Sequence, residues 1–303
     1  MGRLLCYDDS IMTPRSPNLH LHEKKIKQLE LMAVKIREDI IAMLLAAGSG
    51  HSAGPLGMSD IFTALYFHVL IHKPKQPDWK DRDRLILSNG HICPVRYAAM
   101  AEAGYFPKKD LLTLRKFGSP LQGHPERERL PGSETTSGPL GSGSSQAVGL
   151  AYAALMDKAP WRVYSVMSDG ELDCGQTWEA MLFAGRNGLY NCTFIIDRNN
   201  IQIDGTTEDI MPLEPLADKF RAFGLNVITC AGNDIADFVT AIEQAHGVSD
   251  KATVIIANTV PGKGVDFMEY DYRWHGIPPN KEQAKEALKQ LRTLQGKILS
   301  EHE

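Results

Sequence analysis

The sequence predicts an α/β protein with a doubly wound, mostly parallel sheet. Short apolar runs of strand length alternate with segments of helical periodicity in the second half of the chain, and this alternation is typical of parallel sheets. In addition, polar residues follow directly on two of the apolar runs. Such residues are expected where ligands meet the carboxyl ends of parallel strands.

Composition narrows the class of protein. The 303 residues are 43% hydrophobic and 23% charged, as in ordinary globular proteins. A formal net charge of −4 provides no basic surface for nucleic acid, and no apolar run reaches the roughly 18–20 residues that span a membrane. The cysteines form no C-x-x-C pair, so we expect neither a disulfide framework nor a structural zinc site. They are Cys6, Cys93, Cys174, Cys192 and Cys230. A cytoplasmic location fits best.

Residues 1–22 are polar, contain two prolines and lack the apolar core of a signal peptide. We therefore predict a flexible N-terminal extension, followed by a single domain over 23–303. The domain begins with a helix over 23–47, where apolar residues recur at helical spacing. After a loop over 50–55, which Gly54-Pro55 indicates, we expect a helix over 58–69 and a short buried strand over 85–87.

A polar stretch rich in glycine and proline occupies 118–143. Connections of this length inside compact domains are usually functional or disordered. Behind it, a run of small residues predicts a helix over 144–156. Strands are then expected at 163–167, 192–196, 226–229 and 253–257, with helices at 176–184 and 235–245. A charged helix over 281–299 forms a C-terminal tail.

Asp169 and Asn199 follow two consecutive predicted strands. Because one helix joins these strands, their ends should lie side by side. Their carboxylate and carboxamide oxygens, together with nearby backbone carbonyls, are hard donors that suit Mg²⁺ (or Ca²⁺ or Mn²⁺) rather than zinc. Taken singly, Asp169 could be a helix N-cap and Asn199 a turn residue at positive φ. At this spacing the pair favours a metal site.

Five segments combine glycine with histidine or acidic residues. They are Ser49-Gly50-His51, Leu87-Ser88-Asn89-Gly90-His91, Gly123-His124-Pro125-Glu126, Glu134-Thr135-Thr136-Ser137-Gly138-Pro139-Leu140-Gly141, and Ser168-Asp169-Gly170 with Asn199 thirty residues after Asp169. In this order they resemble the motifs of transketolases, in which G-D-G and a later Asn form the thiamine-diphosphate motif. The resemblance implies a thiamine-diphosphate-binding fold of the diphosphate-binding type.

The resemblance also implies roles for individual residues. Asp169, Asn199 and the backbone carbonyl of Ile201 would bind Mg²⁺. Contacts with thiamine diphosphate would come from His51, His91, Gly138, Pro139, Leu140, Asp169, Gly170, Glu171, Asn199 and Ile203. The catalytic residues would be His51, His124 and His275, which would bind the sugar and move protons near neutral pH.

Transketolases transfer a two-carbon ketol unit between sugar phosphates, and the cofactor carries the difficult chemistry. Full-length members also contain a pyrimidine-binding domain, whose glutamate activates the cofactor. This chain is similar to the N-terminal subunit of a split transketolase. We therefore expect a separate C-terminal subunit that carries the pyrimidine-binding domain, in a heterotetramer.

Some positions depart from the family pattern. Ser168 replaces the first glycine of G-D-G, and Cys174 stands where family members have a glutamate at the interface between paired sites. The residues over 271–273 occupy the region of an additional family histidine, so that His275 alone is retained there. Two alternatives stay open: a deoxyxylulose-phosphate-synthase-like enzyme subunit, and a non-catalytic cofactor-binding regulatory partner.

Overall fold

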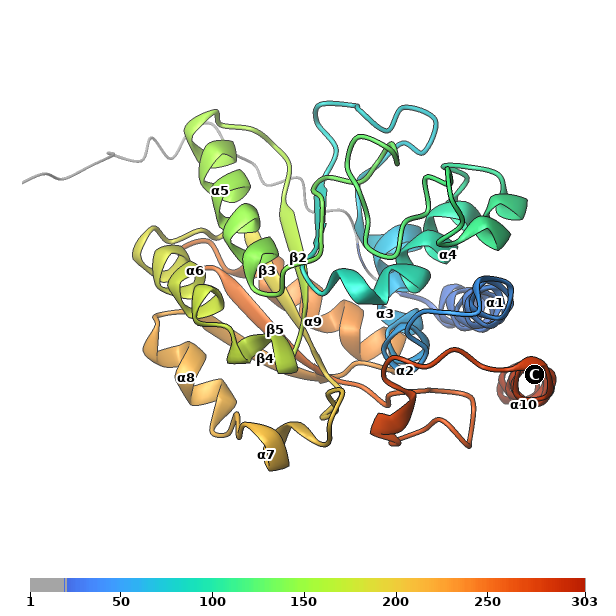
Figure 1. Ribbon diagram of the computed structural model, residues 1–303. Helices are drawn as coiled ribbons and strands as arrows, with labels where there is room; N and C mark the ends of the chain where they lie inside the picture. The colour runs from blue at the N-terminus through green and yellow to red at the C-terminus, as the bar shows by residue number, and fades with distance from the viewer. Residues whose placement is uncertain (1–18, 20, 303) are drawn as a thin grey trace, which may run out of the picture.

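A computed structural model describes residue 19 and residues 21–302 of the chain. Its strands are β1 (Arg84–Leu87), β2 (Val163–Ser168), β3 (Cys192–Arg198), β4 (Asn226–Ala231) and β5 (Thr253–Asn258). They form one sheet in the order β1-β2-β3-β5-β4, and Figure 1 labels β2 to β5 between the helices that cover the sheet. Every pairing in this sheet is parallel. The predicted doubly wound parallel sheet is thereby confirmed.

Helices cover both faces of the sheet because successive strand residues point to opposite sides. One face packs its apolar side chains, such as Ile86, Phe194 and Val254, in a core with α5, α6 and α8. The other face packs Leu87, Ile195 and Ile255 among others against α1, α3, α4, α9 and α10. The bounds of these helices are α1 Glu23–Ala47, α3 Ser59–Ala64, α4 Cys93–Ala103, α5 Ser142–Met156, α6 Gly175–Arg186, α8 Leu216–Ala222, α9 Ile235–Gly247 and α10 Lys281–Glu301.

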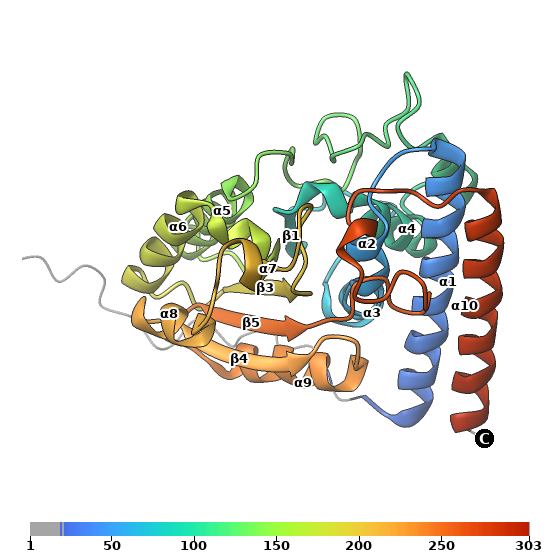
Figure 2. The same ribbon diagram turned by 60° about the horizontal axis from the view of Figure 1, so that its bottom comes forward.

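The predicted C-terminal tail is the helix α10, which runs alongside α1 at one end of the sheet (Figure 2). A capping box formed by Asn280 and Gln283 begins the helix, and this arrangement satisfies backbone groups at its first turn. Ala284, Ala287 and Leu291 are buried on its inner side. The tail is therefore part of the core and does not project from it.

The region between α1 and α3 differs from the prediction. The expected loop over 50–55 contains a short helix, α2 (Ala53–Gly57). Pro55 lies in its first turn, where the missing N–H of proline costs nothing, although the Gly-Pro sequence indicated a loop. The helix expected over 58–69 changes character inside its span, since α3 is followed by a π-helical turn, Leu65–Val69.

Sequence patterns also missed several short elements. The helices α4, α7 (Thr207–Ile210) and α8 were not predicted. Helices of four to eleven residues show too few apolar repeats for a clear helical period. Short 3₁₀ helices occupy Gly90–Ile92, Lys108–Thr113, Gly170–Asp173 and Tyr272–Trp274.

The predicted N-terminal extension lies almost entirely outside the described residues, which exclude 1–18 and 20. Residues 19, 21 and 22 are the exceptions, and among them the side chain of Leu19 is 2% exposed and belongs to the core. Its carbonyl accepts a hydrogen bond from Nε2 of His68 at 2.8 Å. None of the helices in the described part of the chain is both long and apolar enough to cross a membrane.

Candidate functional site

The carboxyl ends of β2 and β3 meet at one edge of the sheet. Ser168 is the register partner of Asp197, so the residues that follow the two strands emerge together. The backbone N–H of Asn200 donates to Oδ2 of Asp169 at 2.7 Å. The prediction that the strand ends carrying Asp169 and Asn199 lie side by side is therefore confirmed.

Asp169 is completely buried. Its Oδ1 accepts the Gly170 N–H at 2.8 Å, and its Oδ2 forms an ion pair with Nη1 of Arg198 at 3.3 Å. Burial raises the pKa of Asp169 to about 6, although the Asn200 N–H and the Arg198 charge act in the opposite direction. Burial thus disfavours the charged form of the Asp169 carboxylate, and each positive partner stabilises that form.

Arg198 is itself fixed in place by other groups. Its Nη1 donates to Oγ1 of Thr207 at 2.8 Å, and its Nη2 pairs with Glu208 at 2.7 Å and Glu214 at 3.0 Å. These contacts tie the segment after β3 to the strand end. The guanidinium lies between the buried Asp169 and two more exposed carboxylates.

The carboxamide of Asn199 is oriented by its neighbours. Its Nδ2 donates to Oδ2 of Asp197 at 2.8 Å, and its Oδ1 accepts the Ile201 N–H at 3.0 Å. A carbonyl oxygen has two lone pairs, so the second remains available to a ligand. Asn199 and Ile201 both line the pocket described next.

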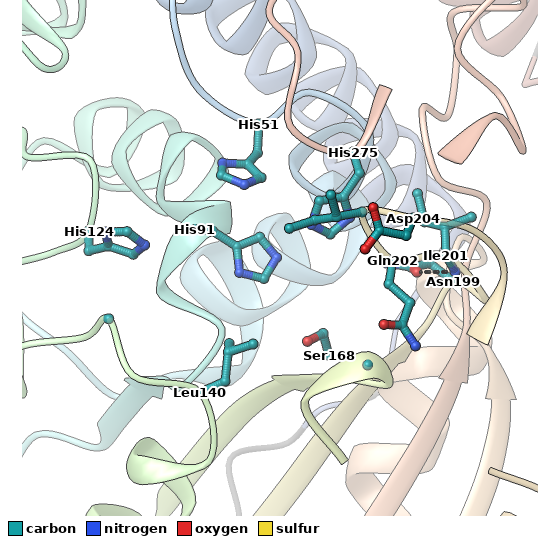
Figure 3. Close-up of a pocket in the computed structure, with 14 residues that line it drawn as sticks. His51, His91, His124, Leu140, Ser168, Asn199, Ile201, Gln202, Asp204 and His275 are labelled. Atoms are coloured by element: carbon teal, nitrogen blue, oxygen red, sulfur yellow. Dashed lines mark hydrogen bonds between the residues drawn. The ribbon is translucent and has the colours of Figure 1, made fainter. Parts of the chain in front are cut away.

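A pocket of about 330 Å³ opens at this edge of the sheet (Figure 3). Ten of the residues predicted for the site line it: His51, His91, His124, Gly138, Leu140, Gly170, Asn199, Ile201, Ile203 and His275. Pro139, Asp169 and Glu171 do not line it. The sequence analysis missed Gly54, Ser168, Gln202 and Asp204, which do. Gln202 and Asp204 belong to the same short turn as Ile201 and Ile203. Their position in the sequence could therefore have indicated that they also line the pocket.

Three histidines from distant parts of the chain form one cluster (Figure 3). The ring centroids of His51 and His91 are 4.9 Å apart, those of His51 and His275 are 5.3 Å apart, and those of His91 and His275 are 5.2 Å apart. Burial, together with the neighbouring histidines, lowers the pKa of His51 to about 4 and that of His91 well below its usual value. Burial also lowers the pKa of His275. All three imidazoles are therefore neutral at pH 7.

His124 lies to one side of this cluster and is more exposed. Burial first, and then the charge of Arg115, lower its pKa. The loop that carries it approaches the end of β1 closely, since a Cβ on Gly90 would lie 3.2 Å from Cδ2 of His124 and 2.6 Å from Cβ of Ser137. Only glycine fits there without displacing these neighbours.

Glu171, which the resemblance implies as a cofactor contact, does not line the pocket of this chain. Its carboxylate is fully buried behind the pocket wall. It accepts the Gly141 N–H at 2.6 Å, the Ser168 N–H at 3.3 Å and the hydroxyl of Ser88. These three donors belong to the loop before α5 and to the ends of β2 and β1. Glu171 therefore joins the three segments that surround the pocket.

The residues at the strand ends fit a magnesium–diphosphate group. The described part of the chain has no group of three or more His, Cys, Asp or Glu side chains that could hold a metal. Mg²⁺ commonly takes one or two carboxylates and completes its shell with phosphate and water. The residue types match that pattern: Asn199 and Ile201 line the pocket with oxygen donors, and the carboxylate of Asp169 lies directly behind them. In the same pocket, Nδ1 of His51 is buried with no hydrogen-bond partner among the described residues, which leaves a polar group free for a ligand.

The parallel α/β sheet superposes on that of transketolase from Leishmania mexicana with a TM-score of 0.80 and 30% identity, over 93% of this chain and 46% of that chain, so the protein has a thiamine-diphosphate-binding α/β fold. Residues 28–296 match the family described as transketolase, thiamine diphosphate binding domain. The chain belongs to this family.

Similar proteins specify the type of chain. It is 41% identical over 263 residues to the 6-deoxy-6-sulfo-D-fructose transketolase subunit SqwG of Clostridium sp. (strain MSTE9), covering 87% of this chain and 96% of that protein. It is 37% identical over 267 residues to a subunit of the apulose-4-phosphate transketolase of Phocaeicola vulgatus, covering 88% and 95%. Transketolase from Campylobacter jejuni superposes with a TM-score of 0.82 and 32% identity, over 92% of this chain but only 46% of that chain. The chain thus corresponds to the N-terminal subunit of a split transketolase.

Proposed function

We propose that this chain and a separate C-terminal subunit together transfer a two-carbon ketol unit between anionic sugars. The observation that carries the proposal is the pocket in which hard oxygen donors and the neutral histidines meet. Two relatives are named as subunits of transketolases for a sulfosugar and for a sugar phosphate. Phosphate or sulfonate sugars are therefore the substrates that we expect, including those of pentose phosphate metabolism.

Asp169, Asn199 and the backbone carbonyl of Ile201 would hold Mg²⁺, for which Ca²⁺ or Mn²⁺ could substitute. The metal and His91 would bind the diphosphate. Gly138, Pro139, Leu140, Gly170 and Ile203 would contact the rest of thiamine diphosphate, and Glu171 would act through the segments that it joins. When bound, the cofactor supplies the carbon nucleophile and the electron sink.

His51, His124 and His275 would serve as the proton-transfer groups. The pKa of each is lowered by burial first, so that the free enzyme presents neutral imidazoles at pH 7. A neutral imidazole can accept a proton from a sugar hydroxyl at one nitrogen and donate a hydrogen bond from the other. This chemistry suits the alternating proton removal and return that ketol transfer requires.

A protein partner would bind an exposed apolar surface on the C-terminal halves of α5 and α6, which we call the α5–α6 face. It consists of Tyr152, Met156, Leu182 and Phe183, which are 40%, 68%, 59% and 41% exposed. The rings of Tyr152 and Phe183 are 5.5 Å apart, so the face is continuous between the helices. Clustered apolar side chains of this kind mark protein interfaces. We infer that the C-terminal subunit covers this face in a heterotetramer.

Reconstitution of the two chains tests the proposed function. We expect ketol transfer from xylulose 5-phosphate, or from a related anionic ketose, when both chains, thiamine diphosphate and Mg²⁺ are present. Each chain alone should be inactive because each holds only part of the site. Full activity of this chain by itself would contradict the two-chain proposal.

The reaction product distinguishes ketol transfer from the alternative synthase activity. A deoxyxylulose-phosphate-synthase-like subunit would release carbon dioxide from pyruvate, whereas ketol transfer releases an aldose. A regulatory partner would bind the cofactor without turnover. Ser168 does not favour that reading, because its N–H still donates to Glu171 and the strand end is intact. The cytoplasmic location stays a prediction.

A further inference from the structure

The residues that line the pocket provide no positive charge for an anionic substrate. They include no lysine and no arginine, and Asp204 adds a negative charge. The lining histidines are neutral at pH 7 because burial lowers the pKa of each. Any cation that this chain provides for a phosphorylated or sulfonated sugar, in addition to those of the C-terminal subunit, therefore lies just outside this lining.

Arg115 lies next to the two glycines that precede His51 and His124. A Cβ placed on Gly123 would be 3.0 Å from Nε and 3.1 Å from Cζ of Arg115. A Cβ on Gly50 would be 3.8 Å from the same Nε. The guanidinium thus lies between the Gly50 and Gly123 backbones, beside the two histidines.

This guanidinium has no partner in the part of the chain that the structure describes. Arg115 is exposed, and among those residues no hydrogen bond or ion pair involves its side chain. Its charge nevertheless reaches the pocket, since it contributes to the lowered pKa values of His51 and His124. An arginine in this state beside a cation-free pocket is suited to bind a planar or tetrahedral oxyanion through its fork of donors.

The backbone holds Arg115 in an unusual conformation. Its φ is 59°, in the left-handed region that long side chains rarely adopt. The Arg115 N–H donates to the Leu121 carbonyl at 2.9 Å, and Oγ1 of Thr113 bonds with Oγ of Ser119 at 2.7 Å across the same loop. Strained residues of this kind cluster at ligand-binding sites. These contacts hold the loop backbone from which the side chain of Arg115 extends.

We propose that Arg115 binds the terminal oxyanion, phosphate or sulfonate, of the sugar substrate and so selects anionic over neutral sugars. The inference rests on the proposed ketol-transfer function and adds to it a specificity-determining residue from this chain. Arg115 interacts with the end of the sugar that does not react. Its removal should weaken binding of anionic substrates and leave the reaction of neutral ones intact.

The test compares the two-chain enzyme with its Arg115→Gln variant on two donors, xylulose 5-phosphate and the neutral ketose erythrulose. We expect kcat/KM for the phosphorylated donor to fall about tenfold to a hundredfold, the range for loss of a hydrogen bond to a charged group. The value for erythrulose should not change. Arg115→Lys should be intermediate because it keeps the charge but loses the fork. Lys116→Gln removes a neighbouring exposed charge and is the matched control.

Several results would overturn the inference. An equal loss on both donors would mean that Arg115 acts on the chemistry, and a loss of assembly would mean that it contacts the partner. If the wild-type enzyme transferred no ketol unit from either donor, the proposed function would fail separately. The role of Arg115 can then still be tested by adding inorganic phosphate to the cofactor-loaded protein and monitoring the histidine side chains by NMR. Phosphate should shift His51 and His124 in the wild type and in Lys116→Gln, and equal shifts in Arg115→Gln would contradict the inference.

Discussion

At the scale of single residues, the strand-end pair could be predicted because Asp169 and Asn199 follow apolar runs, and His51, His91 and His124 because each follows a glycine. Asp169, Asn199 and His91 lie where those patterns indicate. The position of Glu171 could not be predicted, since nothing local shows that Ser88, more than eighty residues earlier, donates to it. Arg115 was missed for the same reason, because its neighbours at the pocket come from two other segments.

Asp169→Asn tests the proposed metal ligand. The substitution keeps the shape of the side chain but removes the negative charge that a divalent cation needs. We expect the Mg²⁺-dependent affinity for thiamine diphosphate to fall by more than about tenfold, because mutation of residues that only support the metal ligands already lowers metal affinity about tenfold or more. Calorimetric titration measures it. Asp173→Asn, an exposed carboxylate four residues later, is the control. An unchanged affinity would remove Asp169 from the site.

Glu171→Gln tests the buried carboxylate that joins the pocket segments. All three partners of Glu171 are donors, whereas an amide presents one acceptor oxygen and one NH₂ donor. One oxygen would thus be replaced by a donor that faces other donors. We expect a loss of about 1–3 kcal/mol in the free energy of unfolding, measured with urea. Glu179→Gln on the exposed side of α6 should have no effect, and equal stability of both variants would contradict the role given to Glu171.

At the scale of elements, the long periodic helices and the buried strands follow from the sequence. The bounds of α1 agree with the prediction, and the five strands differ by only one or two residues at an end. The short helices α2, α4 and α7 could not be predicted because tertiary contacts, rather than a repeated apolar pattern, stabilise them. The packing of α10 on α1 also needs the whole fold, since the two helices are at opposite ends of the chain.

The α5–α6 face provides a prediction for assembly. Phe183→Glu places a charge in the centre of a surface that we expect the partner to cover, and burial of an unpaired charge is unfavourable. The two chains should then fail to associate in sedimentation velocity, while the fold of this chain is unchanged by circular dichroism. Leu299→Glu on α10 is a matched control, because Phe183 and Leu299 are both 41% exposed. Normal assembly of Phe183→Glu would exclude this face as the interface.

At the scale of the whole molecule, buried ionisable groups make stability depend on pH in opposing ways. Burial raises the pKa of Asp39 and of Asp197 to about 7. Their folded forms hold protons more tightly than the unfolded chain, so these groups favour the fold as pH falls. Histidines with lowered pKa values act in the other direction. The contribution of one group to the pH dependence of stability can therefore be isolated only by comparing variants of that group with the wild type.

His246 is suited to such a comparison. Burial, with a smaller contribution from Arg162, lowers its pKa from 6.5 to about 3, and its Nε2 is 2.8 Å from the hydroxyl of Tyr164. The unfolded chain takes up the proton first, so the contribution of His246 is present above pH 6.5 and is lost as pH falls toward 3. In urea unfolding, wild type should lose more stability than His246→Gln as pH falls through this range. Parallel profiles would contradict the assignment.

The ion pair between Arg198 and Asp169 has a consequence for biosynthesis. The guanidinium offsets the buried carboxylate within the chain itself, so a newly made polypeptide can complete its fold before it meets a cation. Glu208 and Glu214 pair with the same guanidinium, so its charge would stay balanced if Asp169 bound a cation. We therefore expect the apoprotein to fold completely without cofactor and to accept the vitamin-derived cofactor afterwards.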